Sequence, residues 1–269
     1  LEPCDPVFSV IFPDGSRMTY PASIEEKAEI ISRISPEDGK AWLEYASYIG
    51  DFMRTAVNGF FLSPVNNMVD MTKVMLKDPH LLKFLPLFTS SFEDVMRKYF
   101  KNERVQDSLS YPGKFCGQPP ALAPGIFAFL SYAEHEGVWF PRGGMIAVPE
   151  ALRRCGERYG LEVRMSQEVS KVMVRDRGVE GVILADGTEI TAKVVISNIN
   201  AKRLYLEKIG EEHLPWLARY GMKSYRLSAS APMINVGLDY RPPLDAHHTI
   251  VTDSMDKINE YWFGGMRQG

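Results

Sequence analysis

The segment from Gly137 to Asn200 constrains the fold of this chain more than any other part of the sequence. It begins with an aromatic-Pro-Arg-Gly-Gly sequence, WFPRGGM at 139–145, which is followed by one helix, a short strand and a three-stranded meander over 161–197. Asp176-Arg177-Gly178 and Asp186-Gly187 supply the turns of the meander, and Asp-Gly is a strong hairpin signal. This order of elements predicts a unit built on an antiparallel sheet.

Helical and strand patterns surround this segment. Residues 7–20 form a predicted hairpin, and the pattern from Ser23 to about Phe100 is helical. Ser23 followed by Glu26 is a capping-box signature, and Ser35-Pro36 opens the next helix. Further strands are expected at about 226–238 and 247–252. We therefore expect an α+β fold, in which a mixed, mainly antiparallel sheet is covered on one side by the helices of 23–135 and the meander lies beside it.

The loop Arg142-Gly143-Gly144-Met145 is the strongest candidate for a ligand site. Two glycines let a backbone approach a flat ligand closely. The following helix offers unpaired N–H groups, and Pro149 must lie in its first turn, which places the helix start at 145–148. A tight strand-to-helix turn without a ligand explains the same residues, so both interpretations stay open.

Composition excludes several classes of function. The net charge of -3 and the lack of a Lys/Arg run argue against nucleic-acid binding. Cys4, Cys116 and Cys155 lie far apart, and His247-His248 has no acidic partner at ligand spacing, so we expect neither disulfides nor a metal site. No GxGxxG, GxSxG or HExxH motif occurs, which leaves the catalytic residues unassigned. No apolar run approaches a membrane span and no signal peptide is present, so we expect a cytoplasmic protein.

Three further groups of residues carry weaker signals. The segment 67–100 is rich in Met, Leu and Phe with flanking lysines, which fits a helical core, an adaptable wall for a large apolar ligand, or a face that rests on a membrane. The neighbouring carboxylates of Glu25-Glu26 and Glu211-Glu212 are typical of a solvated face. His135, between two glutamates, is expected at a surface helix end.

Taken together, the motifs resemble the phytoene desaturase family, the carotenoid/retinoid oxidoreductase branch of the flavin-dependent amine-oxidase-like proteins. The resemblance rests on WFPRGGM, Glu168-Val169, Gly181-Val182, Asp186-Gly187 and VVISN at 194–198. Two other segments, DPVFSVIFPDG at the start and SASAPMINVGLDYRPPLDAHHTIV near the end, are similar to the family's substrate domain. The resemblance covers essentially the whole chain.

This resemblance implies an FAD enzyme that acts on C=C bonds of a long polyisoprenoid, with the flavin accepting or donating hydride. It implies that Arg142, Gly143, Gly144 and Met145 lie against the isoalloxazine. It also implies that Glu168 and Val169 offer backbone contacts to the adenine, and that Ser197 and Asn198 close the meander near the cofactor. Because a flavin carries most of the chemistry, no acid/base triad is expected.

The resemblance also implies a division of the chain into parts. Residues 1–140 and 201–269 correspond to the substrate domain, and 141–200 to the cofactor-binding half. The family's N-terminal glycine motif and C-terminal flavin segment would lie outside Leu1–Gly269, so we expect a central fragment that does not retain FAD by itself. An apolar tunnel between sheet and helices is expected to bind substrate. Its predicted residues are Phe84, Phe88, Phe127 and Trp139, with Phe60, Phe61, Phe115, Phe129 and Tyr132 as further candidates.

Two rival functions remain open at this point. One is a lipid-binding or interaction module derived from the family that has lost the cofactor, so that this chain by itself need not be an enzyme. The other is a related flavin amine or porphyrinogen oxidase, which the segment around His247-His248 disfavours. The expected partner is an apolar, lipid-like small molecule, with a peripheral membrane contact as an open alternative and the oligomeric state undetermined.

Overall fold

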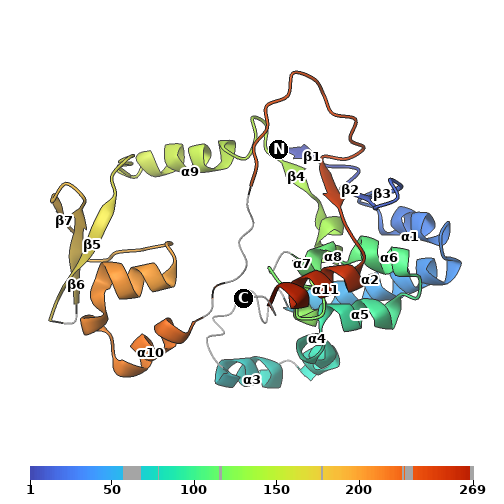
Figure 1. Cartoon of the computed structure of the whole chain (residues 1–269), viewed down its shortest axis with the longest axis horizontal. Helices are drawn as coiled ribbons and strands as arrows, with labels where there is room; N and C mark the ends of the chain where they lie inside the picture. Colours follow the sequence, from blue (N-terminus) through green and yellow to red (C-terminus); the bar gives the residue numbers. More distant parts are fainter. Residues whose placement is uncertain are drawn as a thin grey trace. The chain divides into compact units, whose positions relative to one another are not determined.

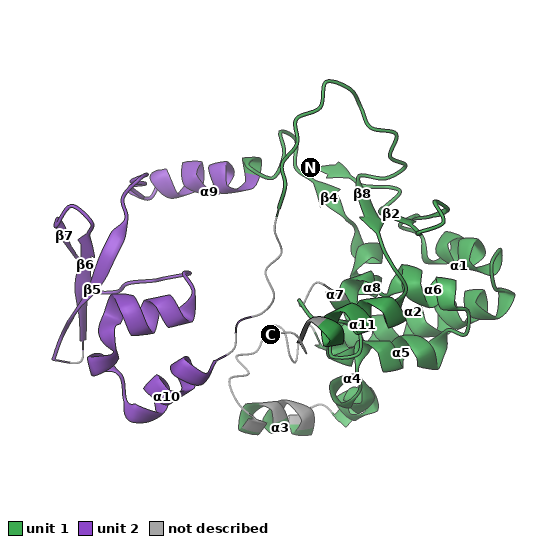
Figure 2. Cartoon of the chain, in the orientation of Figure 1, with its two compact units in different colours: residues 1–147, 229–269 green, residues 148–228 purple. Residues whose placement is uncertain are grey.

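The computed structural model of the chain describes residues 1–56, 68–77, 79–114, 117–176, 178–225, 227 and 233–266 (Figure 1). The chain divides into two compact units, which Figure 2 shows in different colours. Unit 1 comprises residues 1–147 and 229–269, and unit 2 comprises residues 148–228. Unit 1 is therefore built from both ends of the chain, and unit 2 from its middle.

The main sheet of unit 1 has three strands in the order β3-β2-β8. β2 (Phe8–Ile11) and β3 (Arg17–Tyr20) form the predicted antiparallel hairpin, while β8 (His248–Val251) pairs with β2 in parallel. The hairpin turn closes because the Ser16 N–H donates to Asp14 Oδ1 at 2.9 Å. A second pairing joins β1 (Glu2–Pro3) to β4 (Trp139–Phe140).

Two helices that pack against each other follow the hairpin, and their starts follow the predicted capping signals. α1 (Ile24–Ser32) begins after Ser23, whose Oγ accepts from the Glu26 N–H at 3.2 Å. α2 (Pro36–Ala56) has proline at its first position. Gly39 lets the two helices approach closely, since a Cβ there would lie 1.8 Å from Ser32 Oγ.

Short helices complete unit 1. They are α3 (Met68–Lys77), η2 (Pro79–Phe84), α4 (Leu85–Thr89), α5 (Phe92–Tyr99), α6 (Glu103–Leu109), α7 (Tyr111–Lys114), η3 (Gly125–Ala128), α8 (Phe129–Ala133), η4 (Glu134–Glu136) and α11 (Met255–Met266), where η marks a 3₁₀ helix in this unit. None of the described helices is both long and apolar enough to cross a bilayer.

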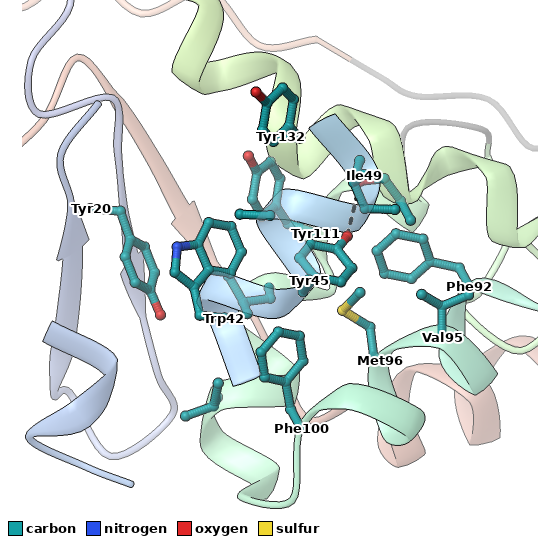
Figure 3. Close-up of a cluster of buried hydrophobic side chains, with 14 of the residues drawn as sticks. Tyr20, Trp42, Tyr45, Ile49, Phe92, Val95, Met96, Phe100, Tyr111 and Tyr132 are labelled. Atoms are coloured by element: carbon teal, nitrogen blue, oxygen red, sulfur yellow. Dashed lines mark hydrogen bonds between the residues drawn. The ribbon is translucent and has the colours of Figure 1, made fainter. Parts of the chain in front are cut away.

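The core of unit 1 is aromatic and centres on α2 (Figure 3). Trp42 and Tyr45 are fully buried, and Tyr45 donates its hydroxyl proton to the Ala128 carbonyl at 2.9 Å. Buried members of the Met-, Leu- and Phe-rich segment include Phe92, Met96 and Phe100, which supports the core interpretation for these residues. The expectation that His135 lies at the surface is wrong, because its imidazole is half-buried against Trp42 with its Nε2 atom enclosed.

The described residues of unit 2 form a second sheet, in the order β5-β6-β7, and four helical segments. Its elements are α9 (Ala147–Glu157), β5 (Val169–Arg175), β6 (Gly178–Leu184), β7 (Glu189–Thr191), the π-helix η5 (Arg203–Gly210), the 3₁₀ helix η6 (Glu211–His213) and α10 (Trp216–Ser224). The three strands form an antiparallel meander with the predicted turn at Asp186-Gly187. α9 starts inside the predicted range, and Pro149 lies in its first turn.

Three predicted strands differ from the structure. The third strand of the meander ends at Thr191 rather than near Ser197, because β6 begins at Gly178 and the Ala192 N–H already bonds to the Glu180 carbonyl. No strand forms at 161–165, since the Leu161 N–H folds back onto the Gly156 carbonyl at the end of α9. Residues 233–238 are exposed and have no partner strand within the described part of the chain, and most of 226–232 lies outside it.

Candidate functional site

A hollow of about 470 Å³ lies within unit 2, between β5, β6, the segment 195–199 and η5. Its lining residues are Gln167, Glu168, Val169, Val172, Val182, Val195, Ile196, Ser197, Asn198, Ile199, Arg203, Leu204 and Lys208. Four of the predicted cofactor residues, namely Glu168, Val169, Ser197 and Asn198, therefore line one hollow.

The sheet supplies one wall of the hollow. Val172 of β5 pairs with Val182 of β6, and Val172 is buried. Just before β5, the Glu168 carbonyl accepts from the Ala185 N–H at 2.8 Å, which fixes the backbone at the start of the strand. The sheet side of the hollow is thus apolar and held by the strand pairing.

The π-helix η5 supplies another wall, and its start is set by Asn200. The Asn200 Oδ1 atom accepts from the Lys202 N–H at 3.0 Å, which is a capping interaction. The helix then carries Leu204 and Lys208 to the hollow. Lys208 Nζ lies 3.6 Å from Glu168 Oε1, and only 15% of the lysine side chain is exposed. This ion pair places one cation and one carboxylate at the mouth of the hollow.

The arrangement suits a flat, partly polar ligand. Valine and leucine side chains can cover ring faces, while the polar groups of Ser197, Asn198 and Glu168 can bond to ring edges. The segment 194–198 pairs with no strand in the described part of the chain, so its backbone groups are open to a ligand. No cluster of three or more potential metal ligands occurs among the described residues.

The glycine loop belongs to unit 1 and forms a tight turn. The Gly144 N–H donates to the Pro141 carbonyl, and Arg142 Nε donates to Glu2 Oε1 at 2.8 Å. Gly143 and Gly144 have φ values of +85° and +86°, and a Cβ at either position would meet no atom within 4 Å. The loop is therefore left-handed and open on its outer side, so a flat group could lie against the backbone. Met145 follows the two glycines and is exposed.

The predicted substrate residues take different environments within unit 1. Phe84 is fully buried, with its ring 5.2 Å from Phe52. Phe88 and Phe127 are half-buried against the same core, whereas Trp139 on β4 is 56% exposed. The structure therefore brings Phe84, Phe88 and Phe127 to one core, whereas Trp139 is not among the residues of that core. Among the further candidates, Phe129 and Tyr132 belong to the core, and Phe60, Phe61 and Phe115 lie outside the described residues.

Sequence reasoning missed several residues near these sites. In the hollow of unit 2 these are Arg203, Leu204 and Lys208. They follow the cap at Asn200 with helical spacing, a signal that could have placed them on one helix face beside Asn198.

A second hollow of about 440 Å³ in unit 1 lies where β1, Phe140 and the loop 241–247 meet. There the centre of the His247 ring lies 4.1 Å from that of the Phe140 ring, a contact that sequence analysis did not predict.

Comparisons with known proteins agree on the family. Residues 65–263 match the family described as flavin containing amine oxidoreductase. The phytoene desaturase of Cercospora nicotianae is 29% identical over 265 residues, which cover 93% of this chain and 40% of that protein. The zeta-carotene-forming phytoene desaturase of Myxococcus xanthus is 25% identical, with coverage of 96% and 50%.

A 4,4'-diapolycopene oxygenase from Methylomonas sp is also similar, at 25% identity over 92% of this chain and 49% of that protein. Two of the three relatives are named as phytoene desaturases and the third as an oxygenase, and all three share similarity over nearly all of this chain. The chain spans about half or less of the length of each of them.

Proposed function

The chain belongs to the flavin containing amine oxidoreductase family, and we propose that the protein to which it contributes is an FAD-dependent oxidoreductase acting on C=C bonds of a long apolar polyisoprenoid. Support for the substrate class comes from relatives named as phytoene desaturases and a 4,4'-diapolycopene oxygenase. The observation that carries the cofactor proposal is the convergence of Glu168, Val169, Ser197 and Asn198 on one hollow.

The described residues fit a flavin nucleotide. The apolar sheet wall and polar rim of the hollow in unit 2 suit an aromatic ring system with polar edges. The open glycine loop suits a second flat group, because no side chain fills the space over Gly143 and Gly144. FAD would supply the hydride chemistry when bound. In this proposal the backbone at Glu168 and Val169 holds the adenine, Ser197 and Asn198 lie close to the cofactor, and residues 142–145 support the isoalloxazine.

The rest of the chain would bind and orient the substrate. We assign residues 1–140 and 201–269 to the substrate domain and 141–200 to the cofactor-binding half. The proposed apolar contacts to the substrate are Phe84, Phe88, Phe127 and Trp139. A peripheral membrane contact through α3, η2 and α4 is part of the proposal, since Val69, Leu76, Leu82 and Leu85 are exposed there close to Lys73 and Lys83.

Purification of a longer polypeptide that contains this chain tests the proposal. We expect a yellow protein with the visible absorbance of bound flavin, and Gly144→Val should lower the flavin content because a branched side chain would cover the open face of the loop. Gly160→Val is the matched control, since Gly160 also has a φ of +86° with no atom within 4 Å of a Cβ, but lies at the end of α9. A folded, colourless protein that binds lipid would instead favour a cofactor-less lipid-binding module.

A further inference from the structure

The first residues of the chain lie beside the start of the glycine loop at 142–145. β1 pairs with β4, so that Glu2 lies opposite Phe140. The Cys4 N–H extends this pairing by donating to the Val138 carbonyl at 2.8 Å. β4 ends at Phe140, and the turn of the loop follows directly. The backbone register of the two strands therefore brings the Glu2 side chain next to the loop.

Glu2 binds Arg142, the first residue of the loop. Arg142 Nε donates to Glu2 Oε1 at 2.8 Å, and this is the only ion pair of either residue within the described part of the chain. Arg241 lines the second hollow together with Glu2, yet it forms no ion pair with the Glu2 carboxylate. The carboxylate is thus committed to the arginine of the loop.

This ion pair leaves the outer side of the loop open. An arginine side chain is long and flexible enough to fold back over the residues that follow it. In the structure, however, no atom of Arg142 lies within 4 Å of a Cβ placed on Gly144. The guanidinium is held at β1, and the face over Gly144 stays free.

The charge of the pair gains importance when a ligand covers the loop. Without a ligand, 84% of the Arg142 side chain and 53% of the Glu2 side chain are exposed, and water screens an ion pair of this kind. A flat ring on the loop removes water from one side of the pair. Because charge interactions strengthen as water is removed, a paired and an unpaired arginine then affect the ring differently.

We propose that Glu2 is a positioning residue for the glycine loop. It holds the guanidinium of Arg142 at β1 and neutralises its charge, so that a flat group on Gly143 and Gly144 meets an open face without a net positive charge. The inference rests on the proposed function only where that group is the isoalloxazine of FAD. The positioning of Arg142 by Glu2 can be measured without any cofactor.

Nitrogen NMR of the full chain tests the positioning. We expect the Arg142 Nε–H, assigned through its loss in Arg142→Lys, to exchange slowly with water. Glu2→Ala removes the acceptor and should speed this exchange roughly 5-fold, whereas Glu2→Gln keeps an acceptor oxygen and should slow it relative to Glu2→Ala. Glu26→Gln, an exposed change in α1, should match the wild type. Equal exchange in Glu2→Ala and the wild type would overturn the proposal.

The reduction equilibrium of the flavin in a longer, FAD-loaded polypeptide tests the charge. Reduction adds negative charge to the ring, which a nearby cation stabilises. In Glu2→Gln the arginine loses its counter-charge, so the equilibrium constant for reduction by a reference dye should rise about 5-fold. Arg142→Gln leaves only the carboxylate and should lower the constant by a similar factor. The double variant is neutral again and should return to the wild-type value.

The outcomes separate this inference from the proposed function. A yellow protein in which Glu2→Gln leaves the constant unchanged, or changes it no more than Glu26→Gln does, overturns the charge role while the proposed function stands. A colourless longer polypeptide overturns the proposed function and the charge role with it. The exchange of the Arg142 Nε–H in this chain then still decides whether Glu2 positions the loop.

Discussion

At the scale of single residues, Asp38 connects two parts of unit 1 that are far apart in the sequence. It is fully buried in the first turn of α2. Its two carboxylate oxygens accept from the N–H groups of Lys101 and Asn102, both at 2.8 Å, at the start of α6. One buried side chain therefore satisfies two partly buried backbone donors that have no strand or helix partner of their own.

Asp38→Ala should lower the free energy of unfolding by about 2–4 kcal/mol, because two hydrogen bonds from backbone N–H groups to a buried carboxylate are lost at once. Asp38→Asn keeps one acceptor oxygen but turns the other position into a donor, so it should cost nearly as much. Urea unfolding of the full chain measures both changes. Glu37→Gln is the neighbouring control, since Glu37 is exposed, and an Asp38→Ala variant as stable as this control would show that the contact contributes little.

Single residues also show where sequence reasoning succeeds and where it stops. The cap at Ser23 is local and was predictable, because donor and acceptor lie three residues apart. Lys27 was not, since its position among the glutamates of α1 is typical of a solvated face. Its burial depends on Phe8, Tyr20 and Trp42, which three different elements bring together. A charged sequence pattern that is typical of a solvated helix face can thus contain a buried lysine, because its contacts come from residues far away in the sequence.

At the scale of elements, the meander of unit 2 depends on one close backbone approach. Gly181 of β6 has a φ of +152°, and a Cβ there would lie 2.0 Å from the Ile190 carbonyl oxygen of β7. The β5–β6 register shifts between Met173 and Val174, opposite Gly181 and Val179. The glycine therefore permits an irregular strand to stay paired with both of its neighbours.

Gly181→Ala should push β6 away from β7 and cost roughly 2–4 kcal/mol, since a rigid carbonyl rather than a flexible side chain blocks the new methyl group. Hydrogen exchange of the three strands should show the loss, together with deformation of the hollow that β5 and β6 line. Gly178→Ala is the matched control in the same strand, because its nearest atom would be at an ordinary 3.5 Å. Equal exchange in the two variants would contradict the close approach.

The elements that sequence reasoning identified share a local signal. Glycine, proline or aspartate at fixed positions sets each of them: the hairpin of 7–20, the start of α9 and the turn at Asp186-Gly187. The strand expected at 226–238 rested on residue composition and on a family resemblance. A strand also needs a partner, which 233–238 lacks within the described residues. At the candidate site, Ser197 and Asn198 were identified through a family resemblance, while the wall from η5 became visible only in the structure.

At the scale of the whole molecule, the two units differ in how much apolar surface each buries. Unit 1 contains a continuous core of aromatic and aliphatic side chains. Among the described residues of unit 2, only Val172 and Leu184 are buried hydrophobic side chains, and Ile196 beside the hollow is 94% exposed. Since burial of apolar surface is the main source of folding free energy, unit 2 has much less to oppose the entropy of unfolding.

We therefore expect the isolated chain to unfold in two steps, with unit 2 losing its structure at a lower urea concentration than unit 1. Methyl NMR signals of Val172 and Val105, which are buried in unit 2 and unit 1 respectively, would follow the two steps separately. Val172→Ala should shift only the first step and Phe100→Leu only the second. A single coincident transition would mean that the units unfold as one. In a longer polypeptide that binds flavin, added cofactor should move the first step to higher urea concentration, because a ligand in the hollow stabilises only the folded form of unit 2.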